Sequence, residues 1–100
     1  MLKDLRMKWI TKLLGWKYYI GDRVEMLITL PDNGWVLKGM KGTVKQLRLL
    51  SDIYVVQFDN FDYGCEYNGL TPNNSGWVVE SREMKAINEP RVKTKWVWCL

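Results

Sequence analysis

The sequence contains no histidine, only two cysteines, and few glycine and proline residues, 8 and 3 in a chain of 100. Without histidine the chain lacks the most frequent catalytic base and a common zinc ligand. Cys65 and Cys99 could form only one disulfide, whereas small secreted domains usually carry several, so we expect a reducing compartment, the cytoplasm. The low glycine and proline content, with 26% charged residues, excludes collagen-like and low-complexity chains.

Long hydrophobic runs are also absent. A membrane-spanning helix needs about 20 consecutive apolar residues, and the apolar stretches here are only a few residues long. The apolar positions near the N-terminus are interrupted by basic residues, which argues against a secretory signal. The chain does contain 47% hydrophobic residues, which suits one compact domain.

Charge is distributed unevenly along the chain. Residues 1–19 carry five basic residues and one acidic residue, a net charge of +4. Residues 20–90 carry seven basic and ten acidic residues, a net charge of −3, and residues 91–100 add +3. The basic excess of the whole chain therefore belongs to two ends that flank an acidic body.

The first 19 residues are predicted to form a basic amphipathic helix. Their large apolar residues recur at helical spacing: Leu2, Leu5, Trp9, Leu13 and Trp16. A helix of this kind binds a membrane surface, a nucleic acid or a groove on a partner. We favour the alternative that it packs on its own domain, because its two tryptophans bring a large apolar surface.

After Gly21 the apolar pattern changes to the alternation of β-strands. Strands are predicted over residues 24–29, 43–49, 53–59, 76–80 and 84–87, with a possible β-bulge in the second. Residues 31–34 form a turn, residues 60–75 a long loop, and residues 81–83 suit a single 3₁₀ turn. We therefore expect a mainly β domain over residues 20–89, a small barrel of five to six strands.

Residues 90–100 alternate aromatic and basic positions and are predicted to form a strand or arm. Such a strand could pair with the body of the domain or be captured by another molecule through strand addition. Exposed tryptophans favour aggregation, so we expect self-docking. A homodimer formed by exchange of this strand is the alternative.

Three segments resemble small SH3-like barrel proteins of bacteriophages and bacteria: Gly-Met-Lys-Gly-Thr-Val at 39–44, Tyr-Val-Val-Gln-Phe-Asp at 54–59 and Gly-Trp-Val-Val-Glu at 76–80. The resemblance covers residues 21–87, about two thirds of the chain. A fainter similarity extends to KOW and CAP-Gly modules. The resemblance implies an SH3-like barrel encoded by a phage or mobile element, and it constrains function weakly.

Catalytic residues are hard to find in this sequence. Asp59, Asp62 and Glu66 could bring carboxylates together for acid–base chemistry or for a hard cation, but their spacing matches no metal-binding loop. Cys65 lacks a histidine that would activate it. We interpret the carboxylates as a solvated acidic loop and predict a protein that is not an enzyme and needs no metal or cofactor.

Two binding modes remain. Aromatic side chains beside acidic ones in two loops are typical of protein-binding surfaces. The predicted partner-binding residues are Trp35, Asp59, Asp62, Tyr63, Glu66 and Tyr67. The alternative is KOW-like nucleic-acid binding by a basic set near the second strand. That set comprises Lys38, Lys41, Lys45 and Arg48, and the two basic ends of the chain add to it.

We therefore expect a binding module that docks onto a host protein or nucleoprotein complex in the cytosol and inhibits or modulates it. Its acidic body could complement a basic nucleic-acid channel, as an anti-CRISPR inhibitor would. Direct nucleic-acid binding is the second hypothesis, and a virion or scaffold component is the third.

Overall fold

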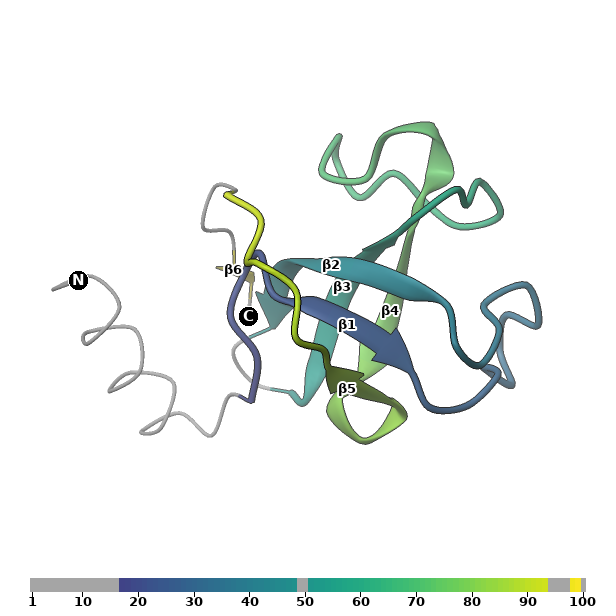
Figure 1. The fold of residues 1–100 in the computed structure, drawn as a ribbon. Helices are drawn as coiled ribbons and strands as arrows, with labels where there is room; N and C mark the ends of the chain where they lie inside the picture. Colours follow the sequence, from purple (N-terminus) through teal and green to yellow (C-terminus); the bar gives the residue numbers. More distant parts are fainter. Residues whose placement is uncertain (1–16, 49–50, 94–97, 100) are drawn as a thin grey trace, which may run out of the picture.

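The structure, a computed structural model, describes residues 17–48, 51–93 and the backbone of 98–99. This part of the chain is mainly β (Figure 1). Its strands are β1 (Arg23–Met26), β2 (Lys41–Arg48), β3 (Ile53–Phe58), β4 (Gly76–Glu80), β5 (Met84–Ala86) and β6 (Trp98–Cys99). Two 3₁₀ turns, η1 (Pro72–Asn74) and η2 (Ser81–Glu83), flank β4. The predicted N-terminal helix lies outside the described residues.

Five strands form one antiparallel sheet in the order β4-β3-β2-β1-β5. The path is open, because no pairing joins β4 to β5 in the described residues; the two edge strands are instead connected through η2. The mainly β prediction is confirmed. So are the bounds of β4 and of the 3₁₀ turn that follows it, where alternation gives way to the polar residues Ser81, Arg82 and Glu83.

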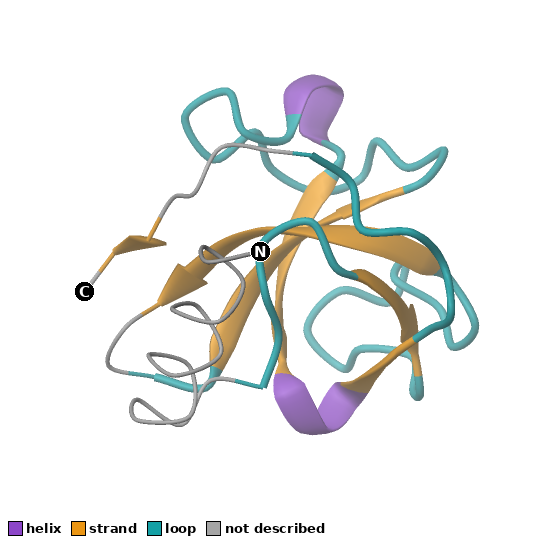
Figure 2. Cartoon of the chain, turned by 60° about the vertical axis from the view of Figure 1, so that its left-hand side comes forward, coloured by secondary structure: helices purple, strands orange, loops and turns teal. Residues whose placement is uncertain are grey.

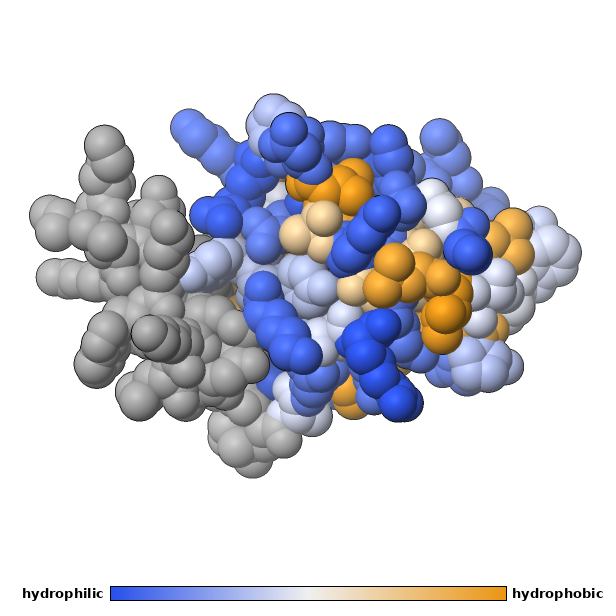
Figure 3. All heavy atoms as spheres, turned by 60° about the horizontal axis from the view of Figure 1, so that its bottom comes forward, coloured by the Kyte–Doolittle hydropathy of each residue, from blue (hydrophilic) through white to orange (hydrophobic). Residues whose placement is uncertain are grey.

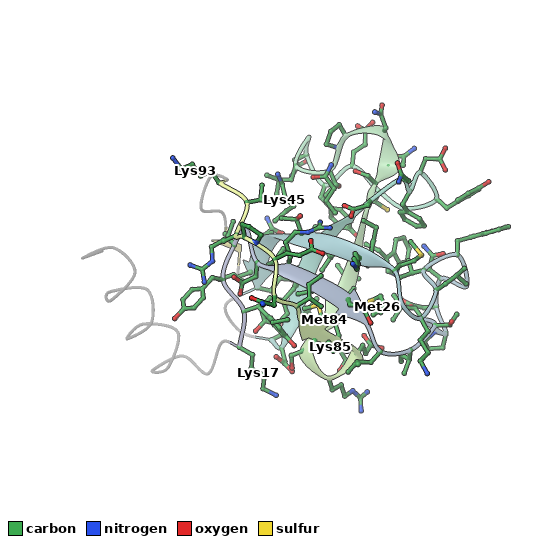
Figure 4. The ribbon with its side chains drawn as sticks, viewed as in Figure 1. Lys17, Met26, Lys45, Met84, Lys85 and Lys93 are labelled. Atoms are coloured by element: carbon green, nitrogen blue, oxygen red, sulfur yellow. The ribbon has the colours of Figure 1, made fainter. Side chains whose placement is uncertain are left out.

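The sheet curves around a single core (Figure 2). Every one of the five antiparallel strands contributes buried side chains to it, because inward and outward residues alternate along each strand. Met26 of β1 and Met84 of β5 are paired in register and lie side by side (Figure 4). From outside the sheet, Tyr18 closes the core and donates a hydrogen bond from its hydroxyl to the carbonyl of Met84 at 2.9 Å.

Strand β2 changes partners along its length. Its first half pairs with β1, and a register shift between Val44 and Gln46 marks the bulge that the sequence suggested. Arg23, the first residue of β1, pairs with Thr43 of β2. Further along β2, β6 takes the place of β1 and pairs in parallel, with Leu47 opposite Trp98. The C-terminal segment therefore adds a short strand to the same sheet, which agrees with the self-docking expectation.

The first strand is shorter than predicted. It ends at Met26, where the Met26 carbonyl accepts a hydrogen bond from the Gly39 N–H at 2.8 Å and the chain leaves the sheet for a long loop, residues 27–40. Leu27 and Ile28, predicted to continue the alternation, are exposed by 40% and 43% in this loop. Alternating hydrophobicity marks candidate strands, but tertiary pairing decides where they end.

Candidate partner-binding surface

Two exposed aromatic rings stack on each other where the 27–40 loop meets the loop of residues 59–75. Trp35 and Tyr63 have ring centroids 4.6 Å apart and an interplanar angle of 15°. Both stay accessible, at 62% and 59% exposure. A stacked pair adds about 0.5–1.5 kcal/mol beyond its buried area, so each ring helps to hold the other in place while leaving its remaining surface free.

The position of this pair is set by Asn33, which is only 9% exposed. Its side-chain Oδ1 accepts a hydrogen bond from the Trp35 N–H at 3.1 Å, the geometry of an Asx turn. Its Nδ2 donates to the Tyr63 carbonyl at 3.2 Å. One buried amide thus joins the two loops and fixes both aromatic residues relative to each other.

The pair is also connected to the core. Tyr63 packs edge-on against Phe61, which in turn packs against Phe58 of β3 at a centroid separation of 5.7 Å. On the other side of Asn33, the Asp32 carboxylate accepts a hydrogen bond from the Trp77 indole Nε1 at 3.3 Å. These contacts tie the aromatic surface to two neighbouring strands of the sheet, and they make it a preorganised site rather than a flexible tip.

Acidic side chains flank the aromatic pair. Asp62 precedes Tyr63 in the chain, Glu66 follows it, and both are exposed. Within the described part of the chain neither makes an ion pair, so their charge remains available to a partner. Tyr67 is half-buried with a positive φ of 48°. Burial raises the pKa of its phenol, and a hydrogen bond with Cys65 raises it further, so Tyr67 stays neutral and contributes mainly packing.

Asp59, predicted together with these residues, has a structural partner. Its carboxylate accepts two hydrogen bonds from Arg23, at 3.0 and 2.5 Å. Arg23 also donates to Glu89 at 2.9 Å, and Lys41 reaches the other oxygen of Glu89 at 3.2 Å. Hydrogen bonding to Asp59 is the main cause of the raised pKa of Arg23. Because its charge is matched within the fold, Asp59 is a poorer docking residue than Asp62 or Glu66.

The basic residues of the nucleic-acid alternative differ in exposure and pairing. Lys38 lies in the exposed loop, and Lys41 is paired with Glu89. Lys45 is half-buried on β2, and the Nε atom of Arg48 is buried without a hydrogen-bond partner among the described residues. Lysines elsewhere point in different directions, as Lys17, Lys85 and Lys93 show in Figure 4.

Several hydrophobic side chains of the 27–40 loop are exposed. Figure 3 shows apolar atoms in patches bordered by hydrophilic ones, with a patch toward the side that carries the 27–40 loop. Besides Trp35, that loop exposes Leu37 by 49%, together with Leu27 and Ile28. Exposed apolar groups on the loop that carries Trp35 are typical of interaction surfaces.

The described residues contain no cluster of three or more His, Cys, Asp or Glu side chains that could hold a metal ion. Asp59, Asp62 and Glu66 therefore do not form such a group. In the same part of the chain, no helix has the length and apolar character that crossing a bilayer requires. No protein-family model, curated protein or solved structure matches this sequence.

The sequence predicted Trp35 and Tyr63 as partner-binding residues but did not indicate Asn33, which bonds both of them, or Asp32, which anchors the same loop to Trp77. Asn33 and Asp32 belong to the Pro-Asp-Asn-Gly segment at 31–34, which predicted only a turn. The turn residues were the available signal, since asparagine often bonds the backbone two residues ahead. Nothing in the sequence showed that the other end of the Asn33 amide would reach Tyr63, 30 positions away.

Proposed function

We propose that this chain is a non-enzymatic binding module that docks onto another protein through the aromatic surface formed by Trp35, Tyr63, Asp62 and Glu66. The observation that carries the proposal is the stacked, exposed Trp35–Tyr63 pair held by a buried asparagine. Tyrosine and tryptophan anchors fixed before binding lose little conformational entropy on association. The unpaired carboxylates beside them favour a partner whose surface is basic.

We also propose that the domain is a small SH3-like barrel. The supporting features are the strand order β5-β1-β2-β3-β4, the 3₁₀ turn between the two edge strands, and a curved sheet with one core. The narrower hypothesis of a phage-encoded inhibitor of a host protein or nucleoprotein, such as an anti-CRISPR, rests on sequence resemblance. A fold of this kind supports many binding functions, so the partner has to be found from the surface.

The test is affinity capture from a bacterial lysate, with and without nuclease treatment, comparing the wild-type chain with surface variants. Trp35→Ala and Tyr63→Ala should abolish retention of a specific partner, because each removes an anchor. Asp62→Lys with Glu66→Lys should weaken it by charge repulsion. Both pairs of substitutions are at exposed positions and should leave the fold intact, which circular dichroism checks.

Lys85→Ala is the matched control, since Lys85 is an exposed side chain of β5, outside the proposed surface. Partners retained equally by wild type, the aromatic variants and the control would refute this surface. Partners that disappear after nuclease treatment would favour the nucleic-acid alternative.

A further inference from the structure

The outer edge of β4 offers a second binding site, defined by the register of the sheet. The Phe58 N–H donates to the Ser75 carbonyl at 2.8 Å, so Phe58 and Ser75 face each other as a hydrogen-bonded pair. Hydrogen-bonded pairs recur at every second residue, so Trp77 and Val79 are the residues of β4 whose backbone bonds β3. Antiparallel pairing alternates, so the N–H and C=O of Gly76, Val78 and Glu80 are directed away from β3. Backbone groups left unpaired at the edge of a sheet are usually covered by other parts of the protein, and where they are not covered they can pair with a strand of another chain.

The fold covers this edge at both ends and leaves its middle open. Gly76 exchanges two backbone hydrogen bonds with Cys65, at 2.8 and 3.1 Å. The Glu80 N–H donates to the Glu83 carboxylate at 2.8 Å. No hydrogen bond from the described residues reaches the backbone of Val78 on its outer side. The N–H and C=O of Val78, which no described residue uses on this side, can therefore bond an added peptide strand.

A groove of about 220 Å³ lies along the same stretch of β4. Its apolar lining comes from Pro31, Ile53, Val78 and Val79, and its polar lining from Asp32, Glu80 and Glu83. Sites for drug-sized ligands measure about 300–1,000 Å³, so this groove suits one or two side chains rather than a whole small molecule. An extended peptide that paired with Val78 would place alternate side chains there.

The charge of the groove indicates what kind of segment fits. Three carboxylates line it, and none of its described lining residues is basic. Arg82 pairs with Glu80 at 3.4 Å, but its side chain is 77% exposed, so the pairing is weak. Pairing of this edge with the same edge of a second copy would bring three carboxylates against these, which disfavours a dimer formed edge to edge. We infer that the Val78 edge binds a basic extended segment of another protein by strand addition, in a groove that lies next to the Trp35–Tyr63 surface and shares Asp32 with its support.

The experiment uses the whole chain labelled with ¹⁵N and an acetylated peptide that alternates lysine and valine. Titration should shift the amide resonance of Val78 and those of groove residues. The same peptide N-methylated at every residue cannot donate to the edge and should bind at least about tenfold more weakly. A peptide that alternates glutamate and valine, with the same apolar side, should also bind at least about tenfold more weakly because the groove repels it.

Two variants of the protein, rather than of the peptide, test whether the backbone of Val78 binds the peptide. Val78→Pro removes the outward N–H without removing a bond to β3, changes the side chain at this position, and should abolish peptide binding; edge strands tolerate proline. Val78→Thr keeps the donor and a similar shape, and should bind as the wild type does. No shift at Val78, equal binding of the N-methylated peptide, or equal binding of the glutamate peptide would overturn the inference. These peptide controls decide the matter even if the proline variant does not fold.

Discussion

At the scale of single residues, the surface proposed for binding depends on one buried amide. Asn33 satisfies both ends of its side chain, with Oδ1 on the Trp35 N–H and Nδ2 on the Tyr63 carbonyl. A buried polar group whose partner is lost costs more than the hydrogen bond contributed. Asn33 is thus a positioning residue that acts through the two rings it fixes and needs no contact with a partner.

Asn33→Asp separates the two bonds of this residue. The aspartate still accepts from Trp35, but it presents an oxygen instead of a donor to the Tyr63 carbonyl. We expect the free energy of unfolding to fall by about 1–3 kcal/mol in urea titrations, and partner retention to weaken. Asn68→Asp is the matched control, because it makes the same chemical change at an exposed position and should cost little. Equal losses in both variants would contradict the proposed role of Asn33.

At the scale of elements, Arg23 connects segments that are distant in the sequence. From β1 it bonds Thr43 of β2 at 2.9 Å, Asp59 just after β3, and Glu89 just after β5. Its own side chain is only 12% exposed, whereas Asp59 is 50% exposed, so the Arg23 end of the network is shielded from solvent and the carboxylate end is not. The segment that follows β5 is also joined to the body by the Val92 N–H, which donates to the Gly21 carbonyl at 2.7 Å.

This network predicts a pH dependence of stability. Hydrogen bonds from Arg23 and Lys41 lower the pKa of Glu89 below its ordinary value of 4.5. The charged form is therefore favoured in the fold, and its contribution is complete above pH 4.5 and is lost as the pH falls through the lowered pKa. Glu89→Gln should reduce the slope of stability against pH below 4.5, as measured by urea unfolding across an acid series.

Glu66→Gln provides the comparison for that series. Glu66 is exposed and forms no ion pair with the described residues, so its removal should leave the acid slope unchanged. Identical slopes for wild type and Glu89→Gln would show that Glu89 does not contribute through this network.

At the scale of the whole molecule, the charges of the body and of the ends have opposite signs. The body from 20 to 90 carries −3, and its Arg23, Lys41 and Lys85 are engaged with carboxylates. A phosphate backbone that approached this body would be repelled by its exposed carboxylates, Asp62 and Glu66 among them. Phosphate binding relies on several lysines or arginines on one face, and the pairing of these three basic residues leaves fewer of them available.

We accordingly predict weak, salt-sensitive DNA binding that does not depend on the basic set of β2 and the preceding loop. Fluorescence anisotropy with a duplex at about 50 and about 200 mM salt should show any low-salt affinity disappear as salt rises. Lys38→Ala combined with Lys45→Ala should leave that affinity unchanged. A clear loss in this double variant, or tight binding at the higher salt concentration, would instead support the KOW-like alternative.

The sequence by itself determined the local elements of this protein. Alternation and turn residues located Gly76–Glu80, the 3₁₀ turn at Ser81–Glu83, and the core of β3, because these depend on neighbours in the chain. The exposure of Trp35 and Tyr63 also followed from their loops.

Only the tertiary structure decided which residues meet. Asp59 turns to Arg23, 36 positions away, instead of joining the acidic surface, and β1 stops at Met26 where pairing with β2 ends. Asn33 bonds both Trp35 and Tyr63 and so brings the two loops together. On β4, Cys65 bonds the backbone of Gly76 and Glu83 bonds that of Glu80, whereas no described residue bonds the outer side of Val78. Each of these outcomes depends on contacts across the sheet, and the free energy of such contacts is set by packing and register rather than by local preference.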